Sequence, residues 1–194
     1  QFYEAGCRNL QFDDCVWGGM VDAKMATALT GRNGQALEDY KKRLLKLNNQ
    51  VVAQAPEDLV INIHVCRGNY HSTFFSSGAY DSVADLLFGE ENVNAYYLEY
   101  DDKRSGGFAP LAKVSGDKKV VLGLITTKIP QLEDKGKVIA RIHEAEKYVP
   151  LDRLYLSPQC GFASCEIGNK LTEEEQWEKL KLVKEIAEEV WGDR

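Results

Sequence analysis

Four residues of the chain have side chains that bind zinc readily in proteins: His64, Cys66, Glu99 and Cys160. Thiolate, imidazole and carboxylate groups are the ligands that zinc prefers. His64 and Cys66 are two residues apart, so on an extended backbone their side chains point to the same side. Glu99 and Cys160 lie too far along the sequence to join them by local spacing. Only a fold that gathers strand ends could unite all four.

Each of these residues also has an ordinary structural alternative. A single cysteine after a strand is usually a small buried hydrophobic residue, and a single histidine is more often a hydrogen-bonded core residue than a ligand. The combination of the four favours a metal site. The remaining cysteines, Cys7, Cys15 and Cys165, are expected to be structural because they lie outside the set of strand ends.

Each candidate ligand closes, or closely follows, a short apolar run that is typical of a β-strand. Five such runs predict strands, at Arg8–Asp13, Leu59–His64, Asn94–Glu99, Val120–Ile125 and Arg153–Ser157. The segments between them have helical patterns of the length that parallel crossovers require. The sequence therefore predicts an α/β fold with a parallel sheet, in which the ligands share the edge formed by the strand ends.

Helical periodicity is clearest from Leu37 to Val51, where apolar residues recur every three or four positions. Near the other end, Thr172 and Glu175 form a capping box ahead of an apolar stripe that reaches Trp191. Weaker helical patterns cover 79–88, 132–147 and, briefly, 108–114. Glycine-rich loops at 31–34 and 104–107 are expected to follow strands, where a βα barrel carries its active-site loops.

The number of strands bears on the architecture. An eight-stranded βα barrel usually takes ~250 residues, whereas this chain of 194 residues gives five strands. Gln1 to Gly6 is typical of the end of a helix with a glycine C-cap. The sequence favours one partial domain over residues 1–194, formed by the last five strands of a TIM-type (βα)8 barrel without the first three. An open parallel sheet with exposed edges is the alternative.

Composition limits the partners. A formal net charge of -6 argues against a broad surface for nucleic acid or anionic membranes. No stretch approaches the ~18 apolar residues of a membrane span. Five cysteines are an odd number, and the first residues lack the pattern of a signal peptide. These features indicate a soluble protein of the reducing cytoplasm.

The candidate ligands carry a family resemblance. His64-Val-Cys66, the later Glu99 and the segment Pro158-Gln-Cys160-Gly resemble the zinc-binding set in the catalytic barrel of cobalamin-independent methionine synthase. Gln11-Phe-Asp13-Asp14 is similar to the Gln-Ile-Asp-Glu segment of that family. The resemblance extends from about Phe2 to the last helix and is specific in order as well as in residue type. It implies a short, single-barrel relative, of which the chain is the later part.

The resemblance implies a zinc-dependent methyltransferase that moves a methyl group from 5-methyltetrahydrofolate to the thiol of homocysteine, giving methionine. A metal lowers the pKa of a bound thiol and so makes it a nucleophile at neutral pH. Asp13 matches the family carboxylate that holds the amino group of homocysteine, with loop capping as its alternative role. Glu99, the hardest ligand, is expected to yield when the substrate sulfur binds.

One position departs from the family pattern. Where the family has a histidine that helps to protonate the folate nitrogen, this chain has Lys128. A lysine, with an ordinary pKa of ~10.4, is a poor acid at pH 7 unless burial or a nearby metal lowers that pKa. Lys128 is the candidate catalytic residue, as a proton donor or as a contact to an anionic methyl donor. A solvated surface lysine is the alternative.

Two other functions stay open at this point. One is zinc-dependent alkyl transfer with another thiol or another donor, such as a methylated corrinoid protein. The other is a non-catalytic zinc-binding fragment. The exposed edges of such a fragment would drive self-association or pairing with a separate chain that carries the first strands.

Overall fold

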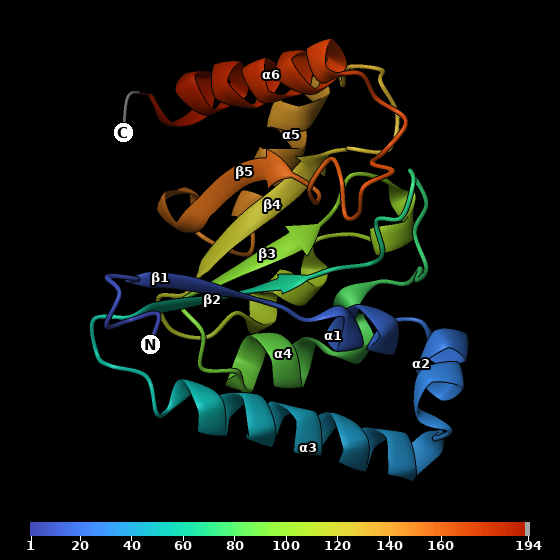
Figure 1. The fold of residues 1–194 in the computed structure, drawn as a ribbon, viewed down its shortest axis with the longest axis vertical. Helices are drawn as coiled ribbons and strands as arrows, with labels where there is room; N and C mark the ends of the chain where they lie inside the picture. Colours follow the sequence, from blue (N-terminus) through green and yellow to red (C-terminus); the bar gives the residue numbers. More distant parts are fainter. Residues whose placement is uncertain (193–194) are drawn as a thin grey trace.

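The computed structural model describes residues 1–192. Its centre is a five-stranded parallel sheet in which the strands follow their order in the chain (Figure 1). The strands are β1 Asn9–Asp13, β2 Val60–Val65, β3 Ala95–Glu99, β4 Lys119–Ile125 and β5 Leu154–Pro158. The five predicted strands and their parallel pairing are therefore confirmed, with boundaries that differ by one residue.

The longer helices lie around this sheet in two groups. Figure 1 shows α1 to α4 beside β1, β2 and β3, and α5 and α6 beside β4 and β5. The helices are α1 Cys15–Met20, α2 Ala23–Thr30, α3 Gly34–Val52, α4 Ala84–Glu90, α5 Lys135–Glu146 and α6 Glu173–Trp191, with short 3₁₀ turns η1 Tyr80–Ser82, η2 Lys103–Ser105, η3 Ala109–Lys113 and η4 Leu151–Arg153. The capping box that begins α6 is present. None of the helices described between residues 1 and 192 is long and apolar enough to cross a membrane.

Three expectations about local structure were wrong. The helices α1 and α2 were not predicted, because both are short and are started by the aspartate caps Asp14 and Asp22 rather than marked by a long apolar stripe. The glycine-rich loop at 31–34 joins α2 to α3 and so does not follow a strand. Residues 2–6 form turns rather than the end of a helix. The loop at 104–107 does follow β3, as expected.

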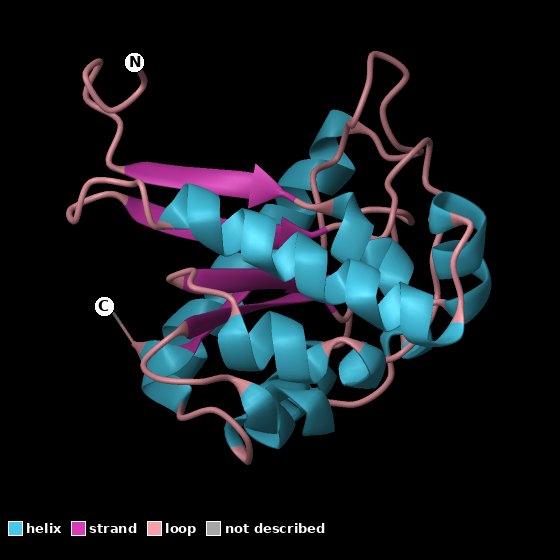
Figure 2. Ribbon diagram, turned by 90° about the horizontal axis from the view of Figure 1, so that it is seen from below, coloured by secondary structure: helices cyan, strands magenta, loops and turns pink. Residues whose placement is uncertain are grey.

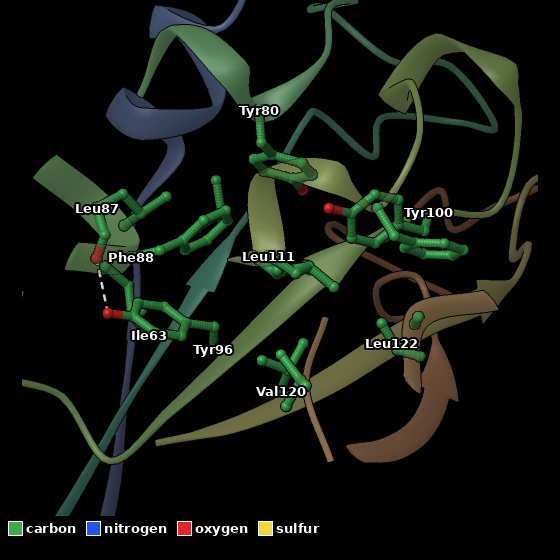
Figure 3. Packing of buried hydrophobic residues seen from close by; sticks show 14 of the residues in the cluster. Ile63, Tyr80, Leu87, Phe88, Tyr96, Tyr100, Leu111, Val120 and Leu122 are labelled. Carbon is green, nitrogen blue, oxygen red and sulfur yellow. Dashed lines mark hydrogen bonds between the residues drawn. The ribbon is translucent and has the colours of Figure 1, made fainter. Parts of the chain in front are cut away.

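Successive side chains along each strand point to opposite faces of the sheet, so that one face forms the core and the other is polar. Ile63, Tyr96 and Leu122 point to the side covered by helices and are fully buried (Figure 3). Rings pack edge to face there, for example Phe88 on Tyr96 at 5.2 Å between centroids, an arrangement that adds to the hydrophobic gain. The Tyr96 hydroxyl donates to the Leu87 carbonyl at 2.6 Å, so this buried polar atom is satisfied.

The opposite face of the sheet carries polar side chains. Gln11, His64, Tyr97 and Ser157 line a hollow there, and every second residue of β1, beginning with Asn9, is exposed. Figure 2 shows the arrowheads of the strands directed toward one group of loops. Because the strands are parallel, residues at their carboxyl ends meet at this edge.

Helix α1 packs directly on the end of β2, and Gly18 makes that approach possible. A Cβ atom at Gly18 would lie 1.9 Å from the Cys66 carbonyl oxygen, which is backbone and cannot swing aside. We expect Gly18→Ala to lower the free energy of unfolding by about 2 kcal/mol or more through overpacking, measured by urea unfolding. Gly107→Ala is the control, since no described atom lies within 4 Å of its Cβ position. Equal stability of the two variants would contradict the close approach.

Candidate metal centre

The structure brings the four candidate ligands to one place. His64 is the second-last residue of β2, and Cys66 directly follows that strand. Glu99 is the last residue of β3, and Cys160 lies two residues beyond the end of β5. One ligand atom from each of the four lies within 4.8 Å of the others. The shared location expected from the strand ends is thus present, while the role of these residues as metal ligands stays a prediction.

Glu99 is the most enclosed member of the cluster, with no exposed surface. Its Oε1 accepts a hydrogen bond from the Arg67 N–H at 2.8 Å, and its Oε2 pairs with Arg104 at 3.0 Å. The hydroxyl of buried Tyr80 accepts the Glu99 backbone N–H at 3.1 Å. Burial raises the pKa of Glu99, and the Arg67 N–H opposes that rise. Both carboxylate oxygens therefore have protein donors of their own.

The two thiols and the imidazole are coupled. A hydrogen bond between the two thiol groups raises the pKa of Cys66, and burial of Cys66 adds to this rise. The same hydrogen bond lowers the pKa of Cys160. Burial lowers the pKa of His64, but its contact with Cys66 and the nearby Glu99 carboxylate outweigh that effect and raise it overall. Cys66 and His64 therefore hold their protons more tightly than usual, and a cation bound there would displace these protons.

The residues fit a zinc ion on two grounds. Their donor set of one nitrogen, two sulfurs and one carboxylate oxygen is a common one for zinc. In addition, the buried Nε2 of His64 has no hydrogen-bond partner among the described residues; its nearest carboxylate oxygens, on Glu99 and Asp13, are at 3.7 and 3.9 Å. An unpaired buried polar atom costs about 1–3 kcal/mol, a cost that coordination removes.

Two further residues at the end of β1 border the cluster. Asp13 is exposed in the hollow beside His64. Cys15, expected from the sequence to be structural, has its sulfur within 4.8 Å of both a carboxylate oxygen of Asp13 and the Cys66 sulfur. Burial and the Cys66 sulfur raise the pKa of Cys15 to about 11. Its position directly after a strand end was the signal that could have identified it.

Lys128 is buried, with 7% of its surface exposed. Its ammonium donates to the Gly68 carbonyl at 2.9 Å and to the Asn69 side-chain oxygen at 3.0 Å. Burial lowers its pKa, and the Glu99 carboxylate opposes that change. The alternative of a solvated surface lysine is therefore wrong. Sequence reasoning did not find Asn69 or Tyr80, because their partners are set by tertiary contacts. It also missed Arg104, although the partners of this residue, Glu99, Asp101 and Asp102, lie within five positions of it.

The buried carboxyl group of Glu91 is linked by hydrogen bonds to the start of α1. Asn48 donates to Glu91 at 2.7 Å and to Asp14 at 3.1 Å. Asp14 in turn caps α1 by accepting from the backbone N–H groups of Val16 and Trp17. Burial raises the pKa of Glu91 from 4.5 to about 7, with the Asp14 charge adding to the rise. The cap of helix α1, which borders the site, is thus linked through Asn48 to a carboxyl group, Glu91, whose pKa is near neutrality.

Comparison with known proteins identifies a family and its members. The family model described as "Cobalamin-independent synthase, Catalytic domain" matches residues 2–189. The chain is 47% identical to YxjG and 48% identical to YxjH of Bacillus subtilis, both uncharacterized, each over 191 residues. These alignments cover 98% of this chain and 50% of each relative. The chain therefore spans about half the length of the curated relatives it matches.

A solved structure agrees with these matches. A Listeria monocytogenes protein, provisionally assigned as a vitamin-B12-independent methionine synthase, superposes with a TM-score of 0.75 at 40% identity. The superposition covers 99% of this chain and 51% of that protein. The Listeria protein thus contains a similar arrangement of the strands β1 to β5.

The raised pKa of Glu91 predicts a pH dependence of folding. Between pH 4.5 and about 7 the folded chain keeps this proton while the unfolded chain loses it. The contribution of Glu91 to the free energy of unfolding must therefore fall as the pH rises through this window, by about 3 kcal/mol, and level off above it. Urea unfolding at pH 5, 6, 7 and 8 measures this slope. Glu91→Gln should flatten it, whereas exposed Glu57→Gln should not; an unchanged slope in Glu91→Gln would reject the assignment.

The cluster predicts one tightly bound zinc ion per chain. Cys66→Ser and Cys160→Ser should each abolish it in metal analysis after purification, whereas Cys165→Ser should retain it. Because His64 and Cys66 have raised pKa values, protons compete with the metal, and zinc affinity should rise with pH between 6 and 8. Zinc retained at full stoichiometry in both variants would remove the cluster from metal binding.

Proposed function

Because the chain belongs to the cobalamin-independent synthase catalytic-domain family, we propose that it takes part in zinc-dependent methyl transfer from 5-methyltetrahydrofolate to the thiol of homocysteine, giving methionine. The observation that carries this proposal is the cluster of His64, Cys66, Glu99 and Cys160 beside a polar hollow. The cluster supplies a place for a soft substrate sulfur, and the hollow supplies room for its amino acid part.

The four clustered residues would hold the metal. Zinc bound there would lower the pKa of the homocysteine thiol, so that the sulfur attacks the methyl group as a thiolate. Glu99 is the residue that we expect to yield to the substrate sulfur. The hydrogen bonds from Arg67 and Arg104 support this role, because they would keep the released carboxylate paired and so reduce the cost of leaving it buried.

Asp13 and Lys128 have separate proposed roles. The Asp13 carboxylate faces the hollow near His64, where it would accept hydrogen bonds from the ammonium group of homocysteine. The Lys128 ammonium donates hydrogen bonds to Gly68 and Asn69. Its third N–H would face the methyl donor, where it would either transfer a proton or supply a positive charge. The lowered pKa of Lys128 supports the first of these uses.

We also propose that the five strands are the later part of a (βα)8 barrel and that residues 1–194 form one partial barrel domain. The polar, exposed side chains of β1 support this view, because a closed barrel would enclose them. Three further strands would pair along β1 and β5. Five free cysteines, two of them proposed ligands, favour a reducing compartment such as the cytoplasm.

The buried lysine at 128 favours a second candidate function, in which the methyl donor differs. A protein that supplies the methyl group from a corrinoid needs no proton on a folate nitrogen, and a fixed lysine would then serve only as a positive charge. This second candidate shares the metal, the thiol and the product with the first.

Incubation of the zinc-loaded chain with homocysteine and 5-methyltetrahydrofolate should give methionine, detected by mass spectrometry, because the four clustered residues would hold the metal that activates the thiol. The Cys160→Ser variant is the control and should give none. Methionine formed only when a methylated corrinoid protein replaces the folate would favour the second candidate. No product with either donor from a fully zinc-loaded chain would indicate a non-catalytic metal-binding unit.

Asp13→Asn should raise the KM for homocysteine by about tenfold to a hundredfold, since a hydrogen bond to a charged group contributes about 1.5–3 kcal/mol. The kcat and the zinc content should change little, because Asp13 is not one of the four clustered ligands. The matched control is Asp117→Asn, at an exposed aspartate just before β4. An unchanged KM in Asp13→Asn would remove this residue from homocysteine binding.

A further inference from the structure

Three loops meet beside the four clustered residues His64, Cys66, Glu99 and Cys160. They follow β2, β4 and β5, and the first and the last of them carry Cys66 and Cys160. Figure 1 shows the segments after β2 and after β5 on the same side of the sheet, beyond the arrowheads. Residues about 100 positions apart in the chain contact each other there, as Ser72 and Asn169 do. The loops that carry the two sulfurs are therefore joined by contacts between distant parts of the chain.

Asn69 ties the two cysteine loops directly. This buried residue is three positions after Cys66, and its side-chain nitrogen donates to the carbonyl of Gly161 at 2.7 Å. Gly161 is the residue after Cys160. A single short side chain thus joins the backbone next to one thiol to the backbone next to the other.

The orientation of the Asn69 amide is fixed by two donors. Its oxygen accepts from Asn169 at 2.9 Å and from Lys128 at 3.0 Å. Asn169 also donates to the Thr127 carbonyl at 2.9 Å, which brings in the loop after β4. Because both hydrogens of the Asn169 amide and the oxygen of Asn69 are used, neither side chain can turn over without losing bonds.

A second tie reaches Cys160 from the other side. Gln159 precedes Cys160, and its side-chain oxygen accepts both the backbone N–H of Thr127 at 2.8 Å and its hydroxyl at 2.7 Å. Gln159 and Thr127 are both buried. Cys160 is therefore flanked by two anchored residues, Gln159 and Gly161.

The loop after β2 is strained where it meets this network. His71 and Ser72 have φ values of 43° and 66°, in the left-handed region that non-glycine residues seldom occupy. The Ser72 N–H donates to the Asn169 side-chain oxygen at 2.9 Å, and the Ser72 hydroxyl accepts the Lys170 N–H at 2.8 Å. Such strain persists only where surrounding contacts over-determine it, and it is concentrated at functional sites.

We propose that Asn69 and Asn169 form a clamp that sets the separation of the Cys66 and Cys160 sulfurs for the metal. They are positioning residues, since neither belongs to the ligand cluster, and the proposal rests on the metal site of the proposed function. The physical reason is preorganisation: ligands on loops reach a precise metal geometry only when the supporting residues hold those loops.

The clamp is tested by metal affinity and by the spectrum of cobalt in place of zinc. Asn69→Ala and Asn169→Ala should each lower zinc affinity about tenfold to a hundredfold, the usual effect of losing an outer-shell partner. Competition with a chromophoric chelator on the purified chain measures this affinity. The cobalt-loaded variants should also show altered thiolate charge-transfer bands. The double variant should be little worse than either single one, because the two residues act as one unit.

Asn49→Ala is the matched control. It removes an asparagine that joins α3 to the end of α4, donating to the Glu90 carbonyl at 2.9 Å and accepting from the Asn92 N–H at 2.8 Å. Its zinc affinity should equal that of the unaltered chain. If Asn69→Ala fails to fold, Asn169→Ala, at a half-buried position, serves alone.

The outcomes separate the clamp from the function on which it rests. Unchanged affinity and spectrum in the asparagine variants, or an equal loss in Asn49→Ala, would overturn the clamp and leave the metal site standing. Failure of the unaltered chain to bind zinc or cobalt would overturn the metal site, and the clamp with it. Neither readout depends on methyl transfer.

Discussion

Parallel pairing of neighbouring strands is the constraint on which the candidate site depends. In this sheet β1 to β5 run in one direction and in chain order, so each crossover returns the chain to the same starting edge. The carboxyl ends then lie side by side, as the pairing of Asp13 with His64 shows. Residues separated by up to 96 positions, such as His64 and Cys160, thereby become neighbours. The core on the helical side keeps the strands in this register.

Charge balance is the second requirement at this edge. Glu99 and Lys128 are both buried, and a buried charge is tolerated only when it is paired and hydrogen-bonded. Arg104 meets this need for Glu99 and also contacts Asp101 and Asp102. Backbone and amide oxygens meet it for Lys128. The site therefore combines a soft sulfur pair with charged groups whose partners are all supplied by adjacent loops.

Sequence reasoning predicted the parts of this arrangement that depend on local pattern. Apolar runs located the five strands, and strand ends placed the four clustered residues together. It did not predict α1, whose six residues include two adjacent glycines, or the position of Cys15 beside Cys66. It also left Lys128 open as a surface residue. The partners of that lysine lie about 60 residues away in the chain, and no local pattern encodes contacts of that range.

All four clustered residues come from β2 and the segments after it, whereas Asp13 comes from β1. Under the proposed function, the metal ligands and the carboxylate that would bind the amino acid part thus come from different stretches of the chain. Under the proposed function, a substitution at Asp13 would change which thiol compound is accepted, while all four clustered residues would stay in the chain.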